Sequence, residues 1–161
     1  MTVTAIELMP GDVAVGRAGD QLKTLLGSCV SVILTDPHRT VGAMCHIVHA
    51  SKPNTSNTRN TAYAEPAFKE LFARLLSLGI NPALCQAYVF GGGNMFPHLF
   101  TEHHVGARNI EWVLNFLAAK SIPVVGQNLG GDAYRVVTWT VGRTEPSVSM
   151  TSTTQDTRDD R

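Results

Sequence analysis

A cysteine and a histidine on neighbouring apolar segments of the chain could form a nucleophilic pair. Cys29 follows Gly27 and Ser28 and opens a β-branched run, and His46 lies in the next apolar run. A thiol attacks as its thiolate, and a nearby imidazole both lowers the thiol pKa and accepts the proton. If the two runs pair as a hairpin, Cys29 and His46 lie near the open end of adjacent strands. The turn at Gly27 and Ser28 would then expose backbone N–H groups that can bind an oxyanion.

Two alternatives compete with this interpretation. Free cysteine is among the most buried residue types, so Cys29 could be an inert core residue. A metal site could instead begin at Cys45, His46 and His49, with His98, His103 and His104 as further ligands. On a strand, His46 and His49 point to opposite faces, and no Cys-x-x-Cys or His-x-x-x-His spacing occurs. The sequence therefore predicts neither a metal ion nor an organic cofactor.

The elements that must position Cys29 and His46 are strands that follow one another directly. Residues 29–35 and 41–49 read as a hairpin, and helical periodicity covers residues 63–78 and 105–120. Six to eight strands with only two helices favour an α+β fold with antiparallel-rich sheets. Further short strands are expected within residues 1–16 and over residues 21–26, 82–90, 122–127 and 134–141.

The glycine run Gly91-Gly92-Gly93 follows an apolar segment and superficially suggests a phosphate-binding loop. It lacks the Gly-Lys-Ser/Thr ending, and Pro97 prevents a helix from following at once. A tight exit from the strand, or a backbone that must approach another chain closely, explains the run better.

Composition narrows the function classes. The chain has 161 residues and 43% hydrophobic composition, and 13 basic residues balance 13 acidic ones. This balance argues against a nucleic-acid binder or a protein of anionic membrane surfaces. Three cysteines without framework spacing, no apolar run of membrane-spanning length and no visible secretory signal favour a cytoplasmic chain with free thiols. The last fifteen residues read as disordered because they offer little to bury.

Five ordered segments resemble the CheD family of chemoreceptor glutamine deamidases. TLLGSCVSVILTDP followed by VGAMCHIVHA is similar to the Gly-Ser-Cys strand of the family and its downstream histidine segment. The segments VFGGGNMF, VGARNIEWVLNFL and IPVVGQNLGG, and the strand with Arg135, look like the later family motifs, in order.

The resemblance implies a three-layer sandwich related to cysteine-dependent deamidating toxins. Together with the polar composition of the last fifteen residues, it predicts a CheD-like domain over residues 1–146 and a disordered polar tail over residues 147–161. It implies Cys29 as nucleophile, His46 as general base and acid, and Thr24 as the residue that orients the imidazole. Gly27 and Ser28 are expected to supply backbone support for the oxyanion. The implied substrates are glutamines on the cytoplasmic helices of methyl-accepting chemotaxis receptors. Some members also hydrolyse receptor methyl esters, and in some bacteria a CheC-type phosphatase is a partner.

Two other functions remain open. One is an adaptor that regulates a phosphatase partner without turnover, against which the intact Cys29 and His46 argue. The other is a cysteine hydrolase of small amides with a similar fold. Release of ammonia from receptor fragments but not from free glutamine would separate the last of these from a receptor deamidase.

Overall fold

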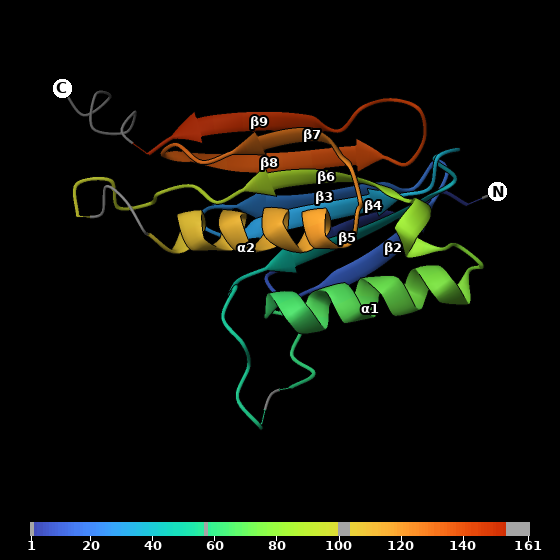
Figure 1. The fold of residues 1–161 in the computed structure, drawn as a ribbon. Helices are drawn as coiled ribbons and strands as arrows, with labels where there is room; N and C mark the ends of the chain where they lie inside the picture. The colour runs from blue at the N-terminus through green and yellow to red at the C-terminus, as the bar shows by residue number, and fades with distance from the viewer. Residues whose placement is uncertain (1, 57, 100–103, 154–161) are drawn as a thin grey trace.

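The structure is a computed structural model that describes residues 2–56, 58–99 and 104–153. Within these residues, the strands and helices follow a fixed order along the chain (Figure 1). They are β1 (Ala5–Leu8), β2 (Val13–Arg17), β3 (Gln21–Leu26), β4 (Val30–Thr35), β5 (Val41–Ile47), α1 (Ala64–Ser77), the 3₁₀ turn η1 (Pro82–Leu84), β6 (Gln86–Gly91), α2 (Val105–Ala119), β7 (Val124–Leu129), β8 (Ala133–Thr140) and β9 (Ser147–Ser152).

The strands form two sheets, and the helices form a third layer. One sheet has the strand order β1-β3-β8-β9, and the other has the order β2-β5-β4-β6-β7. The pairings β1–β3 and β6–β7 are parallel, and the other pairings between named strands are antiparallel. Both helices lie on the same side of the five-stranded sheet (Figure 1). The predicted α+β sandwich of antiparallel-rich sheets with two main helices is therefore confirmed.

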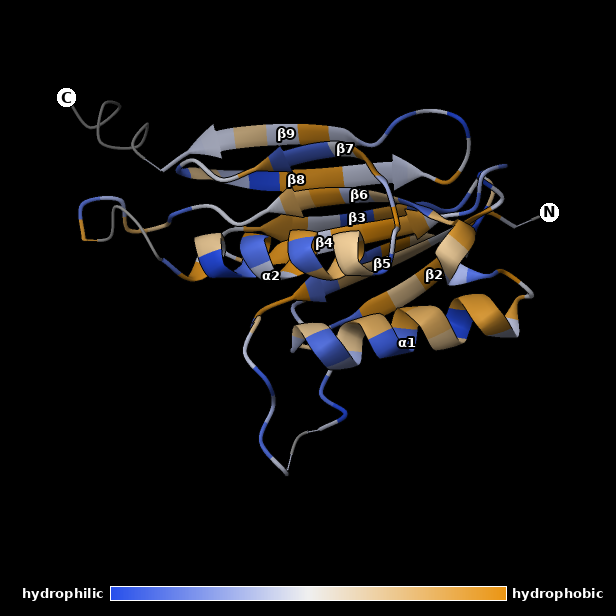
Figure 2. Cartoon of the chain, in the orientation of Figure 1, coloured by the Kyte–Doolittle hydropathy of each residue, from blue (hydrophilic) through white to orange (hydrophobic). Residues whose placement is uncertain are grey.

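The central strands β4 and β5 are buried on both faces, which explains their continuous apolar sequence. Side chains alternate along each strand, so one set meets the helices and the other set meets the four-stranded sheet. On β4, Val30, Val32 and Leu34 pack in the helix-side core, and Ile33 packs in the core between the sheets. Figure 2 colours much of the central strands orange, whereas both helices show both blue and orange along their length. The same alternation sets the direction of the functional side chains.

The predicted hairpin and helices are present. Strands β4 and β5 pair antiparallel, with Ser31 opposite His46. Helix α1 buries Phe68, Leu71 and Leu75, and α2 buries Val113 and Leu117. Stacking of Phe68 on Phe116, with ring centroids 4.3 Å apart, joins the two helices. The helix-side core is therefore closed by both apolar stripes that the sequence periodicity predicts.

The structure corrects two predictions. Ser147–Ser152 forms β9, which pairs with β8, so disorder from residue 147 onward is wrong for these residues. Their side chains are mostly exposed, and backbone pairing rather than apolar burial holds the strand, so the composition carried no signal. Residues 154–161 lie outside the described residues. The predicted strand over residues 82–90 begins instead with η1, because Pro82 and the Asn81 cap favour a turn.

Candidate active site

The loop of Gly27, Ser28 and Cys29 carries the chain from one sheet to the other. It leaves β3 in the four-stranded sheet and enters β4 in the five-stranded sheet. Cys29 is half-buried, and its side chain packs against the apolar core between the sheets. This burial raises the pKa of the Cys29 thiol. The thiol is therefore protonated at neutral pH until a base accepts its proton.

His46 faces the same inter-sheet layer as Cys29. It lies on β5 opposite Ser31, which is two positions from Cys29 along the neighbouring chain segment. Residues related in this way are diagonal neighbours on one sheet face, roughly 7–8 Å apart and within reach of a long side chain. His46 is 2% exposed. Burial lowers the pKa of its imidazole, and this effect outweighs the nearby Asp12 carboxylate and a hydrogen bond with the Leu8 backbone, which raise that pKa.

Thr24 meets His46 from the opposite sheet. Thr24 Oγ1 lies 2.8 Å from Nδ1 of His46, and the same hydroxyl donates to the Leu8 carbonyl oxygen over 2.8 Å. A threonine hydroxyl has one hydrogen, so a hydroxyl that donates to Leu8 accepts from the Nδ1–H of the imidazole. This network assigns the proton of neutral His46 to Nδ1 and leaves Nε2 as an acceptor.

Three successive carbonyl groups of the nucleophile loop accept hydrogen bonds from residues outside the loop. The Gly27 oxygen accepts from Gly93 N, and the Cys29 oxygen accepts from Gly92 N, both over 2.9 Å. The Ser28 oxygen accepts from Nδ2 of Asn109 over 3.2 Å. Among residues 2–56, 58–99 and 104–153, no group accepts a hydrogen bond from the backbone N–H of Ser28 or Cys29. The arrangement therefore leaves two backbone donors beside the thiol.

The glycine run makes this arrangement possible. Gly91 has φ +106°, and a Cβ there would collide with the Cys29 carbonyl oxygen. Gly92 has φ +70°, and a Cβ there would collide with Ile110 of α2. The expectation for this run was a tight strand exit or an approach to another chain, and the structure shows a close approach to the nucleophile loop and α2 of the same chain.

The other cysteines lie away from this layer. Cys45 and Cys85 belong to the helix-side core, and alternation along β5 turns Cys45 to the face opposite that of His46. Burial raises the pKa of Cys45 to about 12 and that of Cys85 to about 11. Thiols of this kind do not ionise near neutral pH, so neither resembles an activated nucleophile.

The remaining histidines are scattered. The ring of His49 lies tilted against that of Tyr63, with centroids 4.8 Å apart, and His104 caps α2 by accepting from Ala107 N at Nδ1 over 3.2 Å. His98 follows the glycine turn, and His103 lies outside the described residues. Within the described part of the chain, no three His, Cys, Asp or Glu side chains gather as metal ligands would.

Two polar residues have roles that the sequence interpretation missed. Asn109 is 1% exposed and binds the nucleophile loop. In the sequence, Asn109 is an amide residue on the same helix stripe as the buried Val113 and Leu117. This position is the signal that could have indicated its role. Arg135, which the sequence marked only as part of a family-like strand, is also 1% exposed, and its guanidinium donates to Asn128 and to the Gly130 and Ala133 carbonyls.

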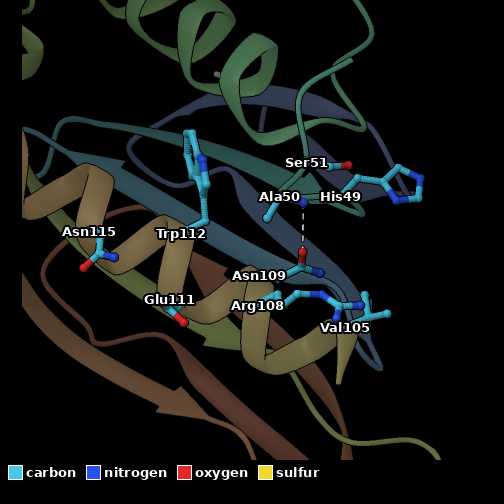
Figure 3. A pocket seen from close by; sticks show the side chains of 9 residues that line it. All are labelled: His49, Ala50, Ser51, Val105, Arg108, Asn109, Glu111, Trp112 and Asn115. Carbon is cyan, nitrogen blue, oxygen red and sulfur yellow. Dashed lines mark hydrogen bonds between the residues drawn. The ribbon is translucent and has the colours of Figure 1, made fainter. Parts of the chain in front are cut away.

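Two hollows lie beside α2, and one of them borders the nucleophile loop. A cavity of about 280 Å³ lies beside Ser28, between the turn of Gly93 to Phe96 and the first turn of α2. A wider hollow of about 720 Å³ lies between α2 and the segment that follows β5, with Asn109 at its floor (Figure 3). Within the described residues, no helix is long and apolar enough to cross a membrane.

Comparison with known proteins agrees with the resemblance in sequence. A family model described as CheD chemotactic sensory transduction matches residues 48–149. "Probable chemoreceptor glutamine deamidase CheD 2" of Albidiferax ferrireducens is 41% identical over 142 residues, which cover 84% of this chain and 81% of the relative. "Probable chemoreceptor glutamine deamidase CheD 1" of Shewanella oneidensis is 35% identical over 130 residues, covering 78% of this chain and 62% of that protein. "Probable chemoreceptor glutamine deamidase CheD" of Methanococcus vannielii is 32% identical over 132 residues, covering 82% and 86%. The chain belongs to the CheD family.

Proposed function

We propose that this protein deamidates glutamine side chains of chemoreceptors through a thioester on Cys29. The relatives named above are described as chemoreceptor glutamine deamidases, which supports the reaction and the substrate class. The proposed roles are Cys29 as nucleophile, His46 as general base and acid, and Thr24 as the residue that orients the imidazole. The backbone N–H groups of Ser28 and Cys29 bind the oxyanion, and Gly27 allows the turn that presents them.

The hydrogen bond between Thr24 and His46 is the observation that carries this proposal. It holds the buried imidazole in one tautomer, with Nε2 directed away from Thr24 and free to accept a proton. Cys29 lies on the same inter-sheet face as that ring. A nucleophile, a base and a third group that orients the base are the parts that acyl transfer requires.

The reaction begins with both groups neutral. His46 Nε2 takes the thiol proton as Sγ attacks the carbon of the glutamine carboxamide, and the N–H groups of Ser28 and Cys29 bind the oxyanion. The imidazolium then gives its proton to the nitrogen, the C–N bond breaks, and ammonia leaves a thioester. Water, deprotonated by His46, attacks the thioester, and Cys29 leaves with the proton from the imidazolium. Glutamate and the starting enzyme result.

The acid role of His46 is as important as its base role, because an unprotonated amide nitrogen is a poor leaving group. The raised pKa of Cys29 and the lowered pKa of His46 keep one proton on the thiol and none on Nε2 before substrate binds. That single proton is the one that ammonia carries away.

The site suits a protein substrate better than free glutamine. A small zwitterion needs charged groups held in a closed pocket to bind its carboxylate and ammonium. The Arg135 guanidinium is already committed to Asn128 and to two backbone carbonyls. The nearby surface instead presents apolar side chains, with Phe96 61% and Val105 45% exposed. Contacts of this kind with residues around the target glutamine would position the amide in a receptor's cytoplasmic helix.

Mass spectrometry of a receptor cytoplasmic fragment tests the proposal. After incubation with the protein, peptides that contain target glutamines should show the mass change of glutamine to glutamate. Cys29→Ala protein should leave them unchanged. A short peptide with the same glutamine, and free glutamine, serve as matched substrates. Equal kcat/KM for all three would favour a hydrolase of small amides, and an unmodified receptor fragment would contradict deamidation.

A further inference from the structure

We propose that Asn109 is a positioning residue that sets the direction of the Ser28–Cys29 peptide and thereby aims the Cys29 N–H at the oxyanion. This inference rests on the proposed acyl-transfer function. Asn109 lies on α2 and touches no reacting atom, so its effect on the reaction passes through the backbone of the nucleophile loop.

All hydrogen-bonding groups of the Asn109 side chain are used. Nδ2 donates to the Ser28 oxygen over 3.2 Å and to the Val48 oxygen over 3.1 Å. Oδ1 accepts from Ala50 N over 2.9 Å, the contact drawn in Figure 3. A flipped amide would set its oxygen against two carbonyls and its NH₂ against an N–H, so the orientation is fixed. One side chain thus joins α2, the nucleophile loop and the segment after the strand of His46.

The geometry of the peptide bond turns this contact into a constraint on catalysis. In a trans peptide, the carbonyl of one residue and the N–H of the next point in opposite directions. Asn109 holds the Ser28 carbonyl toward α2, on the helix side of the five-stranded sheet. The Cys29 N–H is therefore directed away from α2, toward the side on which the Cys29 side chain packs. Among the described residues this N–H has no acceptor.

The peptides on either side of the Ser28–Cys29 peptide are held by backbone hydrogen bonds, whereas the Ser28–Cys29 peptide is held by the side chain of Asn109. Glycine N–H groups hold the Gly27 and Cys29 carbonyls, and those contacts come from the backbone of the glycine turn. The Ser28 carbonyl depends on a side chain. A substitution can therefore release this one peptide while both neighbours stay held.

Two reactions of Cys29 separate a positioning role from a purely structural one. Acylation by p-nitrophenyl acetate forms the S–C bond through an oxyanion and expels p-nitrophenolate. Alkylation by iodoacetamide forms an S–C bond and expels iodide without an oxyanion. Both rates are measured on the Cys29 peptide by mass spectrometry, with circular dichroism as the test of folding. The readout is the ratio of acylation rate to alkylation rate.

Asn109→Asp is the informative variant because it keeps the shape and the acceptor for Ala50 N but loses both donors. We expect its acylation rate to fall at least about tenfold, as loss of an oxyanion donor costs on the order of 10²–10³ in rate. The alkylation rate should stay within about twofold, since no oxyanion forms in that reaction. Asn109→Ala should behave alike. Val113→Ala is the control, because Val113 is buried on the same helix stripe and should leave the ratio unchanged.

A ratio of acylation rate to alkylation rate that stays unchanged in both Asn109 variants would overturn the inference, whether the two rates stay constant or fall together. If the variants do not fold, amide hydrogen exchange of the wild-type protein tests whether the Cys29 N–H lacks a hydrogen-bond acceptor. An unbonded Cys29 N–H exchanges much faster than the Val30 N–H, and strong protection of Cys29 would contradict the inference. A wild-type protein that acylates Cys29 normally but leaves receptor glutamines unchanged would contradict the proposed substrate and not the role of Asn109.

Discussion

Thr24 and His46 belong to different sheets, and their side chains meet in the layer between them, with Oγ1 2.8 Å from Nδ1. Thr24 lies on β3 and His46 on β5, and the nucleophile loop is one of the connections between the two sheets. The packing of one sheet on the other therefore sets the distance from the imidazole to its orienting hydroxyl. The candidate active site exists only when both sheets have formed.

Thr24→Val tests this bond, because valine keeps the shape and removes the hydroxyl. Without its partner, Nδ1 is left unsatisfied and the ring loses its fixed tautomer, so kcat for deamidation should fall by on the order of 10². Steady-state ammonia release on a receptor fragment measures the change. Thr24→Ser retains the hydroxyl and should keep most of the activity. Equal losses in both variants would show that the threonine acts through packing alone.

The pH profile of kcat/KM should be broad. Base catalysis needs neutral His46, whose pKa is lowered from 6.5, so the acid limb should lie below pH 6.5. The reaction also needs the thiol proton for the leaving ammonia, and the pKa of Cys29 is raised above 9.0, so the alkaline limb should lie above pH 9.0. Asp12→Asn removes a charge that raises the pKa of His46, and should move the acid limb to still lower pH.

The competing arrangement is a preformed thiolate–imidazolium pair. Such a pair would make Cys29 react rapidly with iodoacetamide at neutral pH, since the thiolate is the nucleophile. The raised pKa of Cys29 predicts slow alkylation that increases up to and beyond pH 9.0. A rate already on its plateau at pH 7 would therefore refute the neutral pair.

Local periodicity predicted the elements around the site but not the contacts that complete it. The predicted hairpin placed Cys29 and His46 near the open end of adjacent strands, and the structure pairs β4 with β5 antiparallel. The contact between Thr24 and His46 depends on how two sheets pack, which no pattern within one strand encodes. Its expectation came from the family resemblance alone.

Two features, β9 and the role of Asn109, could not be predicted from the sequence for a different physical reason. β9 is held by backbone pairing to β8, so its polar side chains gave no apolar signal. The amide of Asn109 lies on an otherwise apolar helix stripe, and helical periodicity cannot distinguish a buried partnered amide from an exposed one. In both cases the partners are main-chain groups, from the neighbouring strand for β9 and from distant segments for Asn109.

Cys29 should be the only essential thiol. Cys29→Ala should abolish deamidation, and Cys45→Ala and Cys85→Ala should retain most of it, because both residues lie in the helix-side core. Activity of each variant on a receptor fragment is compared at equal folded concentration. Substantial turnover by Cys29→Ala protein would refute the thioester mechanism.

Removal of β9 should destabilise the fold but spare the chemistry. A chain that ends at Pro146 loses the β8–β9 pairing and the packing of Val148 on the inter-sheet core. We expect a cost on the order of 2 kcal/mol, or about 4–8 °C in Tm for a chain of this size. Well below Tm the turnover should be close to that of the full chain. A chain that ends at Thr153 is the control, and the polar composition of residues 154–161 predicts an unchanged Tm. An unchanged Tm after truncation at Pro146 would show that β9 adds no stability.

Gly91→Ala should damage catalysis more than its backbone conformation explains. Alanine at positive φ costs about 1–2 kcal/mol wherever it occurs. At Gly91 the added Cβ would also press on the Cys29 carbonyl oxygen, which Gly92 N must continue to bind over 2.9 Å. The nucleophile loop has to shift in response, and small displacements of reacting groups reduce rates strongly. Gly19→Ala is the matched control, because Gly19 has φ +94°, close to the +106° of Gly91, and only Val3 within 4 Å of the new Cβ, at 3.9 Å. Gly91→Ala should lose more thermal stability than Gly19→Ala because of the collision with the Cys29 carbonyl oxygen, and kcat/KM for deamidation, measured well below the Tm of both variants, should fall about tenfold or more only in Gly91→Ala. An equal fall in the two variants would mean that the glycine turn serves stability and does not set the position of Cys29.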